Sequence, residues 1–187
     1  MKRFLIVAAV PLAALAWHAV QAGEEAPGTD QAFDVRQSMI DGVNPPTLAL
    51  WDVGNNAMSE DGTLALDPAL LTEEDWMRIT EAAYQLGEES HRMASATHFA
   101  ASGPNMVDGE VPEGVSSREE IQAAIAADPD DFRALSKSMA DMAAQIYNAA
   151  ENRDAAAAGE LIFTLDTVCQ SCHVKYWYPQ EARAGAS

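Results

Sequence analysis

Two cysteines and a histidine lie within five residues of one another in this 187-residue chain: Cys169, Cys172 and His173. Residues three and four apart share one face of a helix, so this spacing places both thiols beside the imidazole. Cys-x-x-Cys-His is the attachment signature of c-type haem, in which the thiols form thioethers and the histidine binds the iron. The sequence therefore predicts one covalently bound haem c at these three residues.

Three other chemistries use closely spaced cysteines. A structural zinc site needs four ligands, whereas only three candidate ligands cluster here. A thioredoxin-like redox pair lies at the start of a helix, where the helix dipole favours the thiolate, but these cysteines follow a long helical pattern. A disulfide across two intervening residues would be strained in a helical turn. Haem attachment explains all five positions of the motif.

The first 22 residues resemble a secretory signal peptide. Lys2 and Arg3 supply the positive start, residues 4–17 are mostly apolar, and Val20 and Ala22 are small residues at the expected cleavage positions. The apolar stretch is short for a bilayer span, although an uncleaved membrane anchor is the alternative. We therefore expect export to the periplasm, with no stable membrane insertion after cleavage.

The chain is strongly acidic, with 29 Asp and Glu residues against 11 Lys and Arg residues and a net charge of −18. Such a surface repels nucleic acid and anionic lipid, and it attracts basic proteins over a range set by ionic strength. We expect a basic redox protein as partner and no nucleic acid. Solubility of an exported protein is the alternative explanation of this charge.

Four segments show the three- and four-residue apolar spacing of amphipathic helices, and none alternates as a half-buried strand does. The later three start near residues 72, 128 and 154, where Thr72 and Asp128 suit an N-cap. A shorter helix is expected at residues 117–127. Narrow apolar stripes must pack against one another, which favours an all-α fold: an antiparallel four-helix bundle with the covalent haem on its last helix.

The first predicted helix, residues 31–40, is interrupted early. Asp41-Gly42 and Asn44-Pro45-Pro46 are expected to end it, with a short turn of helix resuming at residues 47–53 and a loop at residues 55–71. The expected domain organisation is a signal peptide at residues 1–22, a flexible leader at residues 23–30, the haem-binding bundle at residues 31–178 and a tail at residues 179–187.

The motif and its place on the final predicted helix resemble the class II c-type cytochromes. These exported four-helix bundles include cytochrome c prime and its low-spin, methionine-ligated relatives, and the aromatic Tyr176 after Cys-His fits their pattern. Family members often carry an Arg-Gln pair on the first helix, with the residue facing the distal side of the haem shortly after it. Arg36-Gln37 and the nearby Met39 resemble that run. The resemblance also implies a homodimer, which the interrupted first helix disfavours.

Met39 is predicted as the sixth ligand of the iron, because a thioether suits haem iron and raises its reduction potential. Core packing is the alternative for Met39, and His91 and His98 are the rival ligands. Arg36 is expected to pair with a haem propionate or with a surface carboxylate. Tyr176 is expected to contact the haem or to fill the core, as are Trp51, Trp76 and Trp177.

Two functions follow from the two forms of the distal side. If Met39 closes the sixth position, single-electron transfer between periplasmic partners is the natural role, and this is the function we expect. If the position stays open, the haem binds nitric oxide or carbon monoxide, as in the cytochrome c prime branch. An enzyme is not expected, because a single haem motif offers no second redox centre and no acid–base groups accompany it.

Overall fold

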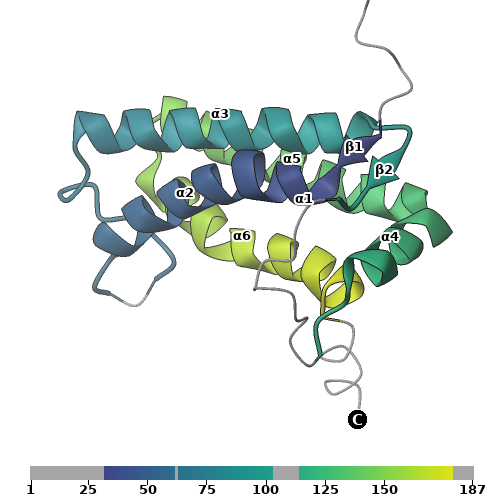
Figure 1. Ribbon diagram of the computed structural model, residues 1–187. Helices are drawn as coiled ribbons and strands as arrows, with labels where there is room; N and C mark the ends of the chain where they lie inside the picture. The colour runs from purple at the N-terminus through teal and green to yellow at the C-terminus, as the bar shows by residue number, and fades with distance from the viewer. Residues whose placement is uncertain (1–31, 62, 103–113, 179–187) are drawn as a thin grey trace, which may run out of the picture.

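The computed structural model describes residues 32–61, 63–102 and 114–178 (Figure 1). The predicted signal peptide, the leader and the tail lie outside these residues. The elements in chain order are β1 (Phe33–Asp34), α1 (Val35–Ser38), η1 (Met39–Val43), α2 (Asn44–Asn56), α3 (Glu73–Ser95), β2 (Phe99–Ala100), α4 (Arg118–Ala127), α5 (Pro129–Glu151) and α6 (Ala155–Tyr176). The described chain is thus mostly helical, as the sequence predicts. No helix in these ranges combines the length and the apolar character needed to cross a membrane.

The long helices begin at side chains that cap them. The Thr72 hydroxyl accepts the Asp75 N–H, and the Asp75 carboxylate accepts the Thr72 N–H, which forms a capping box at the start of α3. Asp128 and Asp154 accept backbone N–H groups in the first turns of α5 and α6. These side chains satisfy donors that the helix cannot pair internally. The predicted starts of these three helices are confirmed.

The predicted end of the first helix at residues 41–46 is wrong. The chain stays helical from α1 through η1, which is a π-helical turn, and directly into α2. The Asn44 N–H donates to the Met39 carbonyl, five residues back rather than four, so the turn holds one extra residue. Pro45 and Pro46 then fall in the first turn of α2, where a missing N–H costs little.

Contacts at the helix ends show how α3 and α5 lie beside each other. The Arg153 guanidinium pairs with Glu73, which places the end of α5 beside the start of α3. The Arg133 guanidinium donates to the Ala96 carbonyl, which places the start of α5 beside the end of α3. Figure 1 shows α3 and α6 on opposite sides of the α1–α2 segment, and α2 contacts both helices. Fully buried side chains between them form the core, among them Leu50, Ile79, Leu86, Phe132, Ile146, Ile162 and Leu165.

Two strands of two residues each add a feature that the sequence pattern did not predict. β1 and β2 pair in parallel, with Phe33 opposite Phe99, and the Phe33 N–H donates to the His98 carbonyl. Strands this short carry no alternating pattern that could be recognised in the sequence. Their pairing fastens the start of α1 to the chain that follows α3.

Candidate haem-binding site

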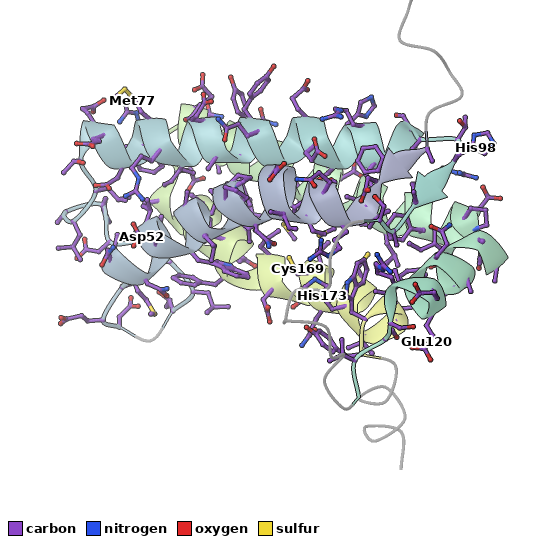
Figure 2. The ribbon with its side chains drawn as sticks, viewed as in Figure 1. Asp52, Met77, His98, Glu120, Cys169 and His173 are labelled. Atoms are coloured by element: carbon purple, nitrogen blue, oxygen red, sulfur yellow. The ribbon has the colours of Figure 1, made fainter. Side chains whose placement is uncertain are left out.

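Helix α6 carries all three residues of the attachment motif on one face. Cys169, Cys172 and His173 are half-buried, and all three line one cavity of about 290 Å³. Figure 2 shows Cys169 and His173 on consecutive turns of α6, between this helix and the α1–α2 segment. The predicted juxtaposition of two thiols and an imidazole is therefore present in the structure.

Three elements enclose this cavity besides α6 itself. η1 and α2 contribute one wall, and α5 contributes Leu135 and Met139. Tyr178, just beyond α6, closes another side and packs its ring edge-to-face with His173, with 6.0 Å between the ring centroids. The apolar lining residues are Met39, Val43, Trp51, Leu135, Met139, Val168 and Tyr178. Such a largely apolar wall with a few polar groups is typical of a cofactor pocket.

The two thiols are protonated and free. Burial raises the pKa of Cys169 to about 11 and that of Cys172 to about 12, and nearby negative charge adds to both shifts. No disulfide joins them. A redox-active pair needs a depressed thiol pKa, so these surroundings disfavour the thioredoxin-like alternative. They suit thiols that are consumed in thioether bonds.

His173 is held as a neutral imidazole. Burial lowers its pKa, and the negative charge of Asp166 opposes this shift only in part. The neutral ring has a free nitrogen lone pair, which is the form that binds a metal ion. The predicted proximal ligand is therefore in the neutral form that can bind iron.

Thr47 brings to the wall of the cavity a polar group that the described residues leave unpaired. Thr47 is 5% exposed and lines the cavity, but its hydroxyl has no hydrogen-bond partner among the described residues. By contrast, the hydroxyls of Ser90, Ser136 and Thr164 each donate to the carbonyl four residues back in their helix. A buried hydroxyl without a partner costs about 1–3 kcal/mol, and a group that fills the cavity and accepts this bond removes the cost. The thiols, the imidazole and Thr47 together fit a haem.

Met39 is the predicted site residue that the structure brings to this cavity from another element. It is the first residue of η1 and lines the wall opposite α6, together with Trp51. Met139 lines the cavity from α5, so a second thioether is also present. His91 and His98 are exposed and do not line it.

Arg36 and Tyr176 do not line the cavity. Tyr176 is 1% exposed, its ring packs against Phe132 at 5.1 Å between centroids, and its hydroxyl donates to Asp131 at 3.1 Å. Arg36 is half-buried on α1 and makes no ion pair within the described ranges. Their predicted contacts with a haem stay predictions.

Sequence reasoning missed several lining residues, among them Val43, Asn44, Thr47, Asp166 and Tyr178. Thr47 had a usable signal, because Met39, Val43, Thr47 and Trp51 recur every four residues and share one helix face. The predicted break at residues 41–46 concealed that repeat.

Comparison with known proteins gives one match. A family model described as "Cytochrome C'" matches residues 72–177, which is more than half of the chain and includes the attachment motif. The matched segment runs from the capping residue of α3 to the end of α6 and does not include Met39. No curated protein and no solved structure matches the chain.

Proposed function

Because the chain belongs to the cytochrome c′ family, we propose that it is a monohaem cytochrome that carries single electrons between redox partners in the periplasm. Proteins of this family hold covalently bound haem c and are typically periplasmic. The observation that carries the proposal is the presence of Met39 and His173, from η1 and α6, in the lining of one cavity. An imidazole and a thioether on the two sides of the iron leave no vacant position for a substrate.

Each lining residue has a defined task in this function. Cys169 and Cys172 hold the haem covalently, His173 binds its iron, and Met39 is the sixth ligand. The haem supplies a one-electron couple between ferric and ferrous iron. The thioether of Met39 favours the ferrous state and so raises the reduction potential. Val43 and Trp51 cover the cavity with apolar surface, which keeps water away from it.

We also infer that α2, α3, α5 and α6 form an antiparallel four-helix bundle. The contacts at the helix ends support this arrangement, since Arg153 pairs with Glu73 and Arg133 donates to Ala96. In addition, the Leu66 N–H donates to the Ala155 carbonyl, which fastens the chain after α2 to the start of α6.

A basic redox protein is the partner that suits this chain. The net charge of −18 favours association with a positively charged surface, and cleavage of residues 1–22 would remove two basic residues and leave the protein still more acidic. In this role the protein is a carrier and not an enzyme.

Visible spectra of the haem-loaded protein test the proposal. We expect a low-spin spectrum with a methionine-to-iron charge-transfer band, no change of the ferrous form with carbon monoxide, and a mass increase of one haem. Met39→Ala should abolish the band. Met142→Ala is the matched control, because Met142 is a half-buried methionine of α5 outside the cavity lining, and it should keep the band.

The second candidate is a five-coordinate haem that binds nitric oxide or carbon monoxide. The description of the matching family, cytochrome c′, supports it, because gas binding is the role that the resemblance to that branch implies. A high-spin spectrum that shifts when carbon monoxide is added, and that is unchanged in Met39→Ala, would replace electron transfer with gas binding as the function.

A further inference from the structure

The π-helical turn η1 determines which side chain of the first helical segment faces the cavity. Met39, Val43, Thr47 and Trp51 line the cavity, whereas Ile40 is 39% exposed. Met39 and Ile40 are neighbours in the sequence. If the helix turned about its axis by the angle of one residue, Ile40 would take the position of Met39.

Helix geometry shows why η1 matters. In an uninterrupted α-helix, residues seven apart share one face, so Ile40 would lie above Thr47. The turn closed by the bond from the Asn44 N–H to the Met39 carbonyl holds one extra residue. One residue corresponds to about 100° of rotation at 3.6 residues per turn. Met39, eight residues before Thr47, therefore takes the position that Ile40 would otherwise hold.

Glu89 of α3 lies against η1 and contacts Ser38, just before the turn, and Gly42, within it. Glu89 is 9% exposed. Its carboxylate accepts a hydrogen bond from the Ser38 hydroxyl at 2.5 Å and forms an ion pair with Arg92 at 2.6 Å. Ser38, itself 7% exposed, directly precedes Met39. Within the turn, a Cβ on Gly42 would lie 2.5 Å from the Glu89 Cγ, so only glycine allows this approach.

These contacts belong to the π-helical register. Relaxation of η1 to an α-helix would rotate Ser38 by about 100° relative to α2. Ser38 would then leave Glu89, and a buried carboxylate that loses a donor is costly. The register that keeps the Ser38 hydroxyl on the Glu89 carboxylate is therefore the register that turns Met39 toward the cavity.

We propose that Glu89, through Ser38 and Gly42, is a positioning residue that holds the π-helical turn and so presents Met39 rather than Ile40 to the haem iron. This inference rests on the proposed role of Met39 as sixth ligand. It goes beyond that role, because it assigns the choice of ligand to a contact with α3.

An exchange of the two neighbouring side chains tests the register directly. In the haem-loaded Met39→Ile/Ile40→Met double variant the methionine at position 40 should face solvent. We expect loss of the methionine-to-iron charge-transfer band, a high-spin spectrum and binding of carbon monoxide by the ferrous form. If the band persists at its original intensity, the register does not select the ligand and the inference is overturned.

Substitution of Glu89 tests the contact. Glu89→Ala should lose most of the charge-transfer band, and adding Ile40→Met to it should restore the band, because the relaxed helix turns position 40 inward. Glu89→Gln keeps an oxygen that accepts the Ser38 hydroxyl and should retain the band. Glu88→Ala is the matched control on the exposed side of α3 and should resemble the unsubstituted protein.

The two proposals fail in different ways. If the unsubstituted protein shows no such band, or keeps it in Met39→Ala, the proposed ligation by Met39 is wrong. If Met39→Ala abolishes the band while Glu89→Ala keeps it in full, ligation by Met39 stands and the positioning role of Glu89 is wrong.

Discussion

Polar groups near the attachment motif and in the cavity wall differ in whether the protein satisfies them. The Tyr176 hydroxyl and the Asp131 carboxylate bond to each other beside α6, and Lys175 pairs with the same carboxylate. Thr47 lines the cavity, and its hydroxyl, which is buried beneath the cavity surface, has no partner within the described ranges. A bound haem that accepts a hydrogen bond from Thr47 would supply the partner that this hydroxyl lacks.

Substitution of Thr47 tests this view of the site. Thr47→Val keeps the shape of the side chain but removes the hydroxyl, so the haem-loaded protein should lose about 1 kcal/mol of its free energy of unfolding. Thr47→Ser keeps the donor and should lose less. Denaturant unfolding followed by Soret absorbance measures both. A Thr47→Val protein as stable as the unsubstituted one would mean that the bound group offers Thr47 no partner.

The attachment residues were predictable because their pattern is local. Cys169, Cys172 and His173 occupy one turn of α6, and Met39 was identified from its distance to Arg36-Gln37. Asp166 lies three residues before Cys169 and seven before His173, so its place on the motif face of α6 could have been read from the spacing. Tyr178 lies beyond the end of α6, and no helical spacing predicts that the chain there returns to the cavity.

At the scale of helices, two glycines in similar positions should respond in opposite ways to alanine. A Cβ on Gly159 of α6 would lie 2.5 Å from the Leu66 backbone nitrogen and 2.6 Å from the Ala65 carbonyl carbon. Backbone cannot give way easily, so Gly159→Ala should destabilise the protein by about 1–3 kcal/mol. The measurement is the unfolding midpoint in denaturant.

Gly87 of α3 is the matched control. Its Cβ would meet the Ala143 side chain at 3.6 Å, which is ordinary van der Waals contact. Glycine inside a helix is less stable than alanine, so Gly87→Ala should raise the free energy of unfolding by about 0.5–1 kcal/mol. A loss of stability in Gly87→Ala comparable with that of Gly159→Ala would contradict this account of the two contacts.

The start of α3 should give a pH-dependent contribution to stability. Hydrogen bonds from the Thr72 side chain, and then from the Thr72 N–H, lower the pKa of Asp75 below its usual value of 3.8. A carboxyl group with a lowered pKa in the folded state stabilises the protein above the unfolded-state pKa. The contribution is lost as the pH falls through the lower folded-state value.

Asp75→Asn tests the sign of this effect. At neutral pH the variant should be less stable by about 0.5 kcal/mol, because an amide carries no charge to favour the positive helix end. The difference should shrink as the pH falls below 3.8, where Asp75 itself becomes protonated. Thermal unfolding across the acid range measures it. A difference that stays constant with pH would contradict the assignment to the Asp75 charge.

The helices also show where sequence patterns stop being sufficient. Capping side chains and apolar stripes predicted the starts of α3, α5 and α6, since both signals lie within each helix. The continuous path from α1 to α2 was missed, because Gly42 and two prolines usually end a helix. Here the turn is contacted by Glu89, whose carboxylate accepts the Ser38 hydroxyl from 51 residues further along the chain.

For the whole molecule, the large negative charge should control the rate of encounter with a partner. Electron transfer to a basic redox protein should slow several-fold as salt is raised, because the Debye length falls from about 10 Å at 0.1 M to about 3 Å at 1 M. Stopped-flow rates over that range measure it. An acidic partner of similar potential is the control and should react faster as salt rises. Rates that are indifferent to salt would mean that the acidity serves solubility alone.

The placement of the attachment residues has a consequence for biogenesis. Cys169, Cys172 and His173 follow α2, α3 and α5 along the chain. In the proposed export the chain crosses the membrane with its N-terminus first, so the earlier helices reach the periplasm before α6. The segments that form the other walls of the cavity therefore exist before the thiols do. A haem bound as proposed would be tethered last, and a chain truncated before α6 would keep Met39, Thr47 and Trp51 but have no thiol to attach it.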